Sequence, residues 1–344
     1  MMKSIISILF LAGIILFTAS FGEETKTIEE GQSVNELLLD LGDAELPHQL
    51  DPAVKGVSSK RGEEIIKYGF TNNAKGNKVK KQSKHFVCTS CHNVVKDEPD
   101  LSVSDPEERL RYSIENDLPF LQGSSMYGAV NRTSFYNDDY YKKYGDLVYL
   151  ARNNIREAIQ LCATECAQGR ALEDWEIESI LSYLYDIDLK VEDLSFNAIE
   201  KDFIESALND SDVNSKKEAI ELVKSKYLAG SPATFVDPPV KRKNLTFENP
   251  DLQMGKMIYE KSCLYCHENG KYSYLTLDNS NLTFAHLSKK ANGFKRHSIY
   301  QVIRYGVPSY VMKKSYMPNY TAERMSDSQL DNLRAYIDYM AKRG

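Results

Sequence analysis

The sequence predicts a mainly α-helical protein with two domains of similar plan, joined by a linker that is first helical and then extended. Two observations carry this prediction. A cluster of two cysteines and a histidine occurs twice, as "HFVCTSCHNVV" at 85–95 and as "EKSCLYCHENG" at 260–270, and each cluster is flanked by segments with apolar residues at helical spacing. With 344 residues, 42% hydrophobic and 27% charged, the chain is long enough for two buried cores.

The first 22 residues have the pattern of a secretory signal. A lysine precedes an apolar run, and the small residues Ser20 and Gly22 precede an acidic stretch, which predicts cleavage after Gly22. We therefore expect a periplasmic, exported protein. A retained membrane anchor is the alternative, although the run is shorter than the roughly 20 apolar residues of a membrane-spanning helix. No later stretch is apolar enough to span a bilayer, so we expect no transmembrane segment after signal removal.

Beyond the signal at 1–22, we expect a first domain with insertions at 23–189, a linker at 190–247 and a second domain at 248–344. The second domain holds 14 Lys and Arg against 9 Asp and Glu, a net charge of +5, while the rest of the chain carries −11. Such asymmetry is typical of an oriented dipole and not of a nucleic-acid-binding protein, so no nucleic-acid partner is expected. We expect the linker to set the distance between the two domains' sites.

Both cysteine clusters have the spacing Cys-x-x-Cys-His, which is the attachment signal for c-type haem. Two cysteines form thioethers with the porphyrin, and the histidine that follows is placed to become the proximal ligand of the iron. The alternatives, a disulfide or a zinc site, fit less well because the clusters are 175 residues apart and zinc clusters usually share one small module. The pattern predicts two covalent haems, bound by Cys88, Cys91 and His92 and by Cys263, Cys266 and His267.

Helical segments are predicted around both clusters. In the second half, "NPDLQMGKMIYEKSCLYCH" predicts a helix that leads into the cluster, with Gly255 allowing a close helix crossing, and "HSIYQVIRYGV" predicts a helix that ends at Gly306. In the first half, "SKRGEEIIKYG" predicts the corresponding entry helix. About 20 additional residues before Cys88 are expected to form a loop.

A closing helix is predicted at the end of each half. In the second half, Ser326 and Gln329 form a capping-box pattern before an apolar stripe. In the first half, Asp174 is the expected cap of "DWEIESILSYLYDIDL", which carries a similar stripe. The two halves are thus expected to end alike.

With a haem signature between an entry helix and a closing helix, each half resembles the c-type cytochromes. The resemblance implies a mainly α fold of two cytochrome c-type haem domains joined by a helical and extended linker. It also implies that Met317, which precedes Pro318 on the loop before the last helix, is the distal ligand of the second iron. Met317 as a packing residue, and Lys313 or Lys314 as the ligand, are alternatives.

A second pair of cysteines lies in "NIREAIQLCATECAQGR". Cys162 and Cys166 fall on one side of a helix predicted to end near Gly169, so both sulfurs are expected to face the interior. Periodicity alone favours a packing role, because small buried cysteines are common core residues. Two cysteines four residues apart on one helix are poorly placed for a disulfide.

The stretch "AIQLCATECAQGRAL" resembles the thiosulfate dehydrogenase family of dihaem cytochromes and the related sulfur-oxidising (Sox) cytochromes. The resemblance implies that Cys162 binds the first haem iron opposite His92, with Gly169, Arg170 and Leu172 completing the motif. Thiolate ligation would lower the potential of that haem. Cys166 has no counterpart in the motif.

A further departure from that family is the long segment before Cys162, with the aromatic-rich insertion "GSSMYGAVNRTSFYNDDYYKKYG". Met126 in this insertion is a competing distal ligand, and His85 is another. The insertion also carries Arg132 and a set of tyrosines that line either a haem edge or a small-anion pocket, unless they form an ordinary surface loop. The tyrosines are Tyr127, Tyr136, Tyr140, Tyr141 and Tyr144.

These features predict an exported dihaem cytochrome c that transfers electrons to or from a redox protein partner. Resemblance to thiosulfate dehydrogenase implies that it oxidises thiosulfate, a small sulfur oxyanion, at the first haem, with Cys162 at the site and Arg156 or Arg170 holding the anion. A pure electron relay is the alternative. A dihaem peroxidase is a third possibility, but it needs an open iron position, which a bound Cys162 would fill.

Overall fold

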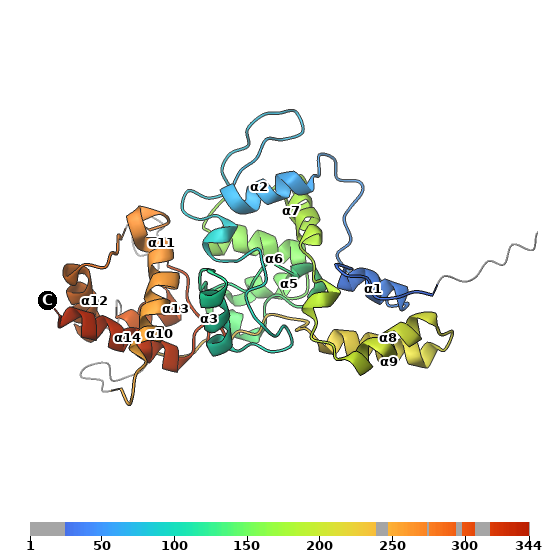
Figure 1. Cartoon of the computed structure of the whole chain (residues 1–344). Coiled ribbons are helices and arrows are strands. Elements are labelled where there is room, and N and C mark those ends of the chain that lie inside the picture. The colour runs from blue at the N-terminus through green and yellow to red at the C-terminus, as the bar shows by residue number, and fades with distance from the viewer. Residues whose placement is uncertain (1–24, 239–246, 274, 294–297, 307–316, 344) are drawn as a thin grey trace, which may run out of the picture.

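The computed structural model describes residues 25–238, 247–273, 275–293, 298–306 and 317–343, and the predicted signal at 1–22 lies outside them. Within these ranges the regular elements are helices, joined by loops and three isolated β-bridges, so the prediction of a mainly α protein is confirmed. Figure 1 shows an elongated arrangement in which the C-terminal helices lie at one end and α1, α8 and α9 at the other. No helix of the described part is long and apolar enough to cross a membrane.

In the first half, the entry helix α2 (Ser59–Tyr68) crosses the closing helix α7 (Asp174–Asp186). They meet at Gly62, where a Cβ would lie 1.9 Å from the carbonyl oxygen of Ser179. Only a glycine permits this approach. The N-cap of α7 is Glu173 and not Asp174 as the sequence suggested, because the Glu173 amide donates to the carboxylate of Glu176 across the first turn.

The second half repeats the crossing. Helix α10 (Leu252–Ile258) lies against α14 (Asp327–Ala341), and a Cβ on Gly255 would lie 2.2 Å from the carbonyl oxygen of Asn332. This agrees with the close crossing expected from the sequence. Helices α12 (Asn281–Gly293) and α13 (Ile299–Tyr305) complete this end of the molecule.

The caps predicted for the second half are present. The Ser326 hydroxyl accepts from the Gln329 amide at 3.0 Å, and the Gln329 side chain accepts from the Ser326 amide at 3.0 Å. Gly306 ends α13 with φ of 70°, a backbone angle that favours glycine.

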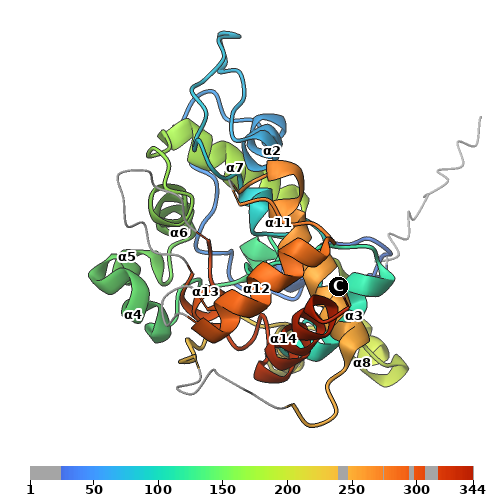
Figure 2. The ribbon, with the colours of Figure 1, turned by 90° about the vertical axis from the view of Figure 1, so that its left-hand side faces the viewer.

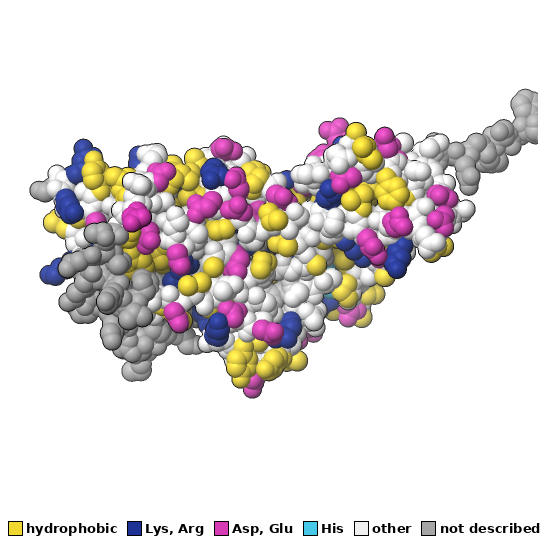
Figure 3. Space-filling model, turned by 90° about the horizontal axis from the view of Figure 1, so that it is seen from below, with side chains coloured by type: hydrophobic (Ala, Val, Ile, Leu, Met, Phe, Trp, Pro, Cys, Tyr) yellow, Lys and Arg dark blue, Asp and Glu magenta, His cyan; other side chains and the backbone are white. Residues whose placement is uncertain are grey.

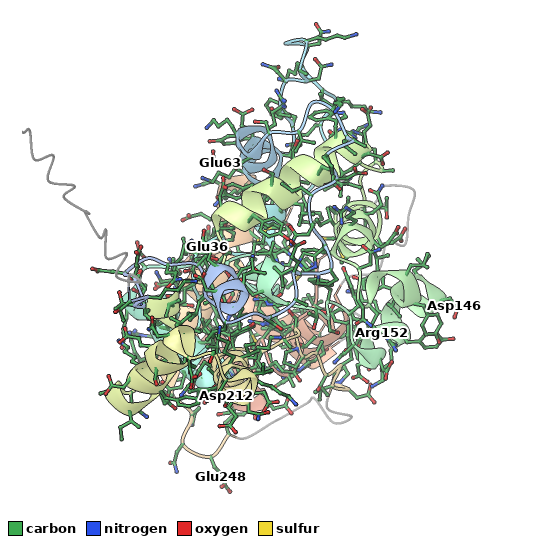
Figure 4. The ribbon with its side chains drawn as sticks, turned by 90° about the vertical axis from the view of Figure 1, so that its right-hand side faces the viewer. Glu36, Glu63, Asp146, Arg152, Asp212 and Glu248 are labelled. Carbon is green, nitrogen blue, oxygen red and sulfur yellow. The ribbon has the colours of Figure 1, made fainter. Side chains whose placement is uncertain are left out.

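The helical part of the expected linker belongs to a third packed unit. Helices α8 (Ala198–Asn209) and α9 (Val213–Ser225) form a hairpin that packs with α1 (Val34–Asp40) around buried side chains. Figure 4 shows Glu36 on α1 and Asp212 at the turn that begins α9. The chain then crosses the first half in extended form, with an isolated bridge between Ser134 and Gly230, as its prolines suggested.

Helix α3 (Pro106–Glu115) joins the two halves directly. It was assigned to the first domain from the sequence, but Leu110, and Phe120 in the loop that follows it, are fully buried in the core of the second half. The side-chain Nε2 of Gln329, at the start of α14, donates to the carbonyl of Pro106 at 2.6 Å. In Figures 1 and 2, α3 accordingly lies beside the helices of the second half.

Shorter elements complete the chain. The short α-helices are α4 (Tyr141–Tyr144), α5 (Val148–Ala151), α6 (Ile155–Leu161) and α11 (Tyr265–His267). The two π-turns are η5 (Cys162–Cys166) and η7 (Tyr259–Leu264). The 3₁₀ turns are η1 (Cys88–Ser90), η2 (Ala129–Asn131), η3 (Asp138–Tyr140), η4 (Gly145–Leu147), η6 (Val191–Asp193) and η8 (Glu268–Gly270).

Replacement of Gly255 by alanine is expected to destabilise the protein although alanine is the better helix former. The new methyl must push α10 away from α14, and overpacking of this kind costs about 1–3 kcal/mol. The free energy of unfolding from denaturant titration measures the effect. Gln253→Ala, at an exposed position of the same helix, is the control and should change the free energy by less than about 0.5 kcal/mol; equal stability of both variants would contradict the tight crossing.

Candidate haem centres

His92 is held in the orientation that an iron ligand needs. Its Nδ1 lies 2.7 Å from the carbonyl oxygen of Ser124, so this nitrogen carries the proton and Nε2 keeps its lone pair. Gly123 lets the loop approach the ring, because a Cβ there would lie 2.5 Å from Nδ1 and Cε1 of His92. The loop is fixed by the amide of Gly123, which donates to the carbonyl of Cys91 at 2.9 Å.

His267 has the same arrangement. Its Nδ1 lies 2.8 Å from the carbonyl oxygen of Leu275, and its own carbonyl accepts from the amide of Leu277 at 3.1 Å. Burial lowers the pKa of both His92 and His267, which favours the neutral imidazole that binds iron. Both predicted proximal ligands are therefore oriented by a backbone carbonyl eight or more residues downstream, a partner that the haem signature does not contain.

The cysteines of both clusters fit covalent haem attachment. All six cysteines of the chain are free thiols, and those of the two clusters are half-buried beside their histidines. Burial raises the pKa of Cys88 to about 11 and that of Cys263 to about 12, so both thiols are protonated at neutral pH. Among the described residues, no group of three or more His, Cys, Asp and Glu is arranged to hold a metal ion by itself.

Cys162 and Cys166 face the first cluster, as the helical pattern predicted. Both sulfurs interact electrostatically with Cys91, and that of Cys162 also with Cys88. The sequence did not reveal that they form a π-turn, closed by the Ala167 amide, which donates to the carbonyl of Cys162 at 2.8 Å. Such turns are frequent at functional sites.

The unexplained cysteine has specific partners in the aromatic insertion. The sulfur of Cys166 lies 3.1 Å from the hydroxyl of Tyr144 and 3.9 Å from that of Tyr136. A hydrogen bond from Cys162 is the main cause that lowers the pKa of Cys166, with the Tyr144 hydroxyl and the charge of Lys143 acting in the same direction. These tyrosines thus surround a sulfur, which a sequence pattern alone cannot show because they lie 22 and 30 residues away.

Two competing ligands of the first site have other contacts in the described chain. The amide of Met126 donates to the carbonyl of Asn93 at 2.8 Å, next to His92, and its side chain packs against the core of the first half, as does Cys88. His85 packs its ring against Phe86 with centroids 6.4 Å apart. These contacts leave Met126 and His85 as alternatives to Cys162.

Met317 packs against the core of the second half together with Cys263. This position is compatible with both expectations for Met317, an iron ligand or a packing residue. Lys313 and Lys314, the alternative ligands, lie outside the described residues.

The two arginines expected to hold a substrate anion have structural partners instead. Arg156 binds both carboxylate oxygens of the buried Glu178, at 2.5 and 3.0 Å. Arg170 binds Glu176 in the same bidentate way, at 2.6 and 2.7 Å, and also donates to a backbone carbonyl. Buried carboxylates thus match the charges of both arginines, which weighs against a role in holding an anion.

The two Cys-x-x-Cys-His clusters contact each other directly. The hydroxyl of Tyr265, inside the second cluster, donates to the carbonyl of Thr89, inside the first, at 2.8 Å. The sulfur of Cys266 lies 3.9 Å from the carbonyl oxygen of Ser90 and interacts electrostatically with Cys91. The two clusters thus meet directly, through residues that do not belong to the expected linker.

The segment after α3 supports this contact. The Phe120 amide donates to the carbonyl of Lys261 at 3.1 Å, and the Phe120 carbonyl accepts from the hydroxyls of Ser262 and Tyr320 at 2.7 and 3.0 Å. Four residues later, Ser124 binds His92. One short segment therefore connects the turn before Cys263 with His92.

Comparison with known families identifies the second half. Residues 250–337 match the family model described as Cytochrome C oxidase, cbb3-type, subunit III. This region is a cytochrome c domain, which supports a covalently bound c-type haem and electron transfer with a redox protein partner. No curated protein and no solved structure matched the chain.

Cys162 and Cys166 are the two cysteines outside the attachment signals, and in the haem-free protein, in which the Cys162 thiol can donate its hydrogen bond, Cys166 is expected to be alkylated faster than Cys162 at neutral pH. Its pKa is lowered, so the reactive thiolate is present above that pKa and is lost as the pH falls through it. Tyr144→Phe removes a hydrogen bond to a charged group, worth about 1.5 kcal/mol, and should raise the midpoint pH of alkylation by about one unit.

Peptide mass spectrometry after iodoacetamide treatment across a pH series measures this midpoint. Tyr149→Phe is the control, since Tyr149 lies four residues after the insertion and is 58% exposed. An unchanged midpoint in Tyr144→Phe, or equal rates for the two cysteines, would contradict the assignment of the thiolate.

Proposed function

We propose that the protein is an exported dihaem c-type cytochrome that passes electrons between its two haems and a redox protein partner. The observation that carries the proposal is the contact between the two Cys-x-x-Cys-His clusters, in which Tyr265 donates to Thr89 and Cys266 lies against Ser90. Each cluster fixes one edge of a haem, so contact between the clusters brings the two haem edges near each other. The cytochrome c domain at 250–337 supports the second of these sites directly.

Bound haem supplies an iron that accepts or donates one electron at a time. The residues of this chain determine how readily it does so. The carbonyls of Ser124 and Leu275 orient the two histidines and increase their basicity. On the opposite side, sulfur from Cys162 would lower the potential at the first site, and the thioether of Met317 would raise it at the second. Unlike ligands favour electron flow from the first site to the second.

The exposed end of the second half is suited to an acidic partner. Lys289, Lys342 and Arg343 are exposed there, and Figure 3 shows several Lys and Arg side chains at this end of the molecule, with Asp and Glu side chains among them. Positive charge near the exit site increases the encounter rate with a negatively charged partner. This supports the second half as the docking end.

The mass of the exported protein should include two haems, and a redox titration should resolve two midpoint potentials. Replacing Cys88 and Cys91 together by alanine should remove one haem and the lower potential. Met317→Ala should retain both haems and lower the higher potential, because the thioether that raises it is lost. Cys162→Ala serves as the comparison and should change only the lower potential. A single haem in the unmodified protein would exclude the dihaem proposal.

A second candidate function is oxidation of thiosulfate at the first haem. One observation favours it: two sulfurs, Cys162 and Cys166, face the first cluster, and Cys166 is held by tyrosine hydroxyls in a π-turn. The bidentate pairs of Arg156 and Arg170 weigh against the anion site that the sequence suggested. Lys143 is another candidate for holding the anion, because its charge acts on both Cys166 and Cys91.

Thiosulfate added to the oxidised, haem-loaded protein distinguishes the two functions. An enzyme should show rapid haem reduction and produce tetrathionate when an electron acceptor is present, and Cys162→Gly should abolish both. Arg156→Lys is the matched control and should retain turnover, because its role is structural. Haems that stay oxidised with thiosulfate but are reduced by dithionite would leave electron relay as the function.

A further inference from the structure

A small cavity of about 40 Å³ lies on the histidine side of the first site, between the first half and the extended segment that follows α9. Arg132 and Tyr127 of the aromatic insertion line it, together with Arg324 of the second half and Ser231 of the extended segment. Three parts of the chain that are distant in sequence therefore enclose one space.

The other charged groups around this cavity are matched in pairs. Asp97 accepts from Arg109 at 2.9 Å, and Glu98 forms an ion pair with Arg324. Lys96 lies 3.5 Å from the carboxylate of Asp193. Each carboxylate that lines the cavity thus already has a cationic partner.

Arg132 is the exception. Among the residues that the structure describes, no carboxylate lies within ion-pair distance of its guanidinium, and its hydrogen bonds are long ones to the hydroxyls of Ser124 and Ser231, at 3.3 and 3.2 Å. Burial and the nearby charge of Arg324 lower the pKa of Arg132 to about 10. The side chain remains charged at neutral pH. The charges of Glu98 and Asp97 act on it from a distance, but neither carboxylate forms an ion pair with it.

We propose that this cavity binds a small inorganic anion of chloride size, held by the guanidinium of Arg132 and the hydroxyl of Ser231, which both line it. Arg132 is half-buried, and a charge that is partly withdrawn from water is costly unless it is paired, so an anion would supply an ion pair that no carboxylate of the described residues forms. The cavity has room for one small ion and water, since a water molecule needs about 10–15 Å³ of such space. The site is on the histidine side, so the anion would act on the haem as an effector and not as a substrate.

The effect on the haem follows from Ser124, whose hydroxyl contacts Arg132 while its carbonyl binds His92. This part of the inference rests on the proposed haem at the first site. An anion beside the proximal histidine stabilises the oxidised iron, which carries one more positive charge, and therefore lowers its midpoint potential.

The test compares redox titrations of the haem-loaded protein in sodium chloride and in sodium gluconate at equal ionic strength, because gluconate is too large for the cavity. The potential of the first haem should be lower in chloride, and that of the second haem should be the same in both salts. Arg132→Gln should abolish the difference. Arg111→Gln, which removes an exposed arginine of α3, should preserve it.

Equal potentials of the first haem in the two salts, or a difference that survives Arg132→Gln, would overturn the proposed effect. Crystals of the unmodified, haem-loaded protein soaked in sodium bromide test the site itself, independently of the variant's folding. An anomalous peak beside the Arg132 guanidinium is expected, and its absence would overturn the anion site. A haem count of one would instead refute the dihaem function. The bromide experiment would then still decide whether the cavity binds an anion.

Discussion

The arrangement of the two sites depends on the position of Phe120. Its side chain is fully buried in the core of the second half, and the guanidinium of Arg109 lies 4.7 Å from its ring centroid. Its amide and carbonyl are both hydrogen-bonded to the turn before Cys263. Ser124 follows only four residues later and binds His92. The hydrogen bonds of Phe120 therefore hold His92 of the first cluster at a constant position relative to the second cluster. The loop contact between Tyr265 and Thr89 is possible only while this position is kept.

The two halves share a close glycine-mediated helix crossing but differ in the segments that surround it. At Gly62 and Gly255, a glycine lets the entry helix touch the backbone of the closing helix, and this crossing positions the start of each Cys-x-x-Cys-His loop. The halves then diverge. The second half keeps a short path from its cluster to the closing helix, whereas the first half adds the aromatic insertion, which places Tyr136 and Tyr144 against Cys166 and Arg132 beside the anion cavity. Chemical differences between the sites thus arise from the insertion and not from the shared frame.

Charge pairing explains which arginines are available for ligands. Arg156 and Arg170 lie in the motif region that suggested an anion site, but Glu178 and Glu176 are buried beside them and match their charges. Arg132, in a segment without a recognisable motif, has no such carboxylate among the described residues. A cation's availability is decided by which carboxylates the fold brings to it, and spacing along the chain does not report this.

By itself, the sequence determined the haem signatures, the helical class and the capped closing helix of the second half, because each depends on residues within a few positions of one another. The close helix crossing at Gly255 could also be predicted, since this glycine lies on an apolar helix face. Only the tertiary structure decided the third packed unit of α1, α8 and α9, the contact between the two clusters and the partners of Cys166 and Arg132. These depend on residues tens to hundreds of positions apart, which meet only when the cores have formed.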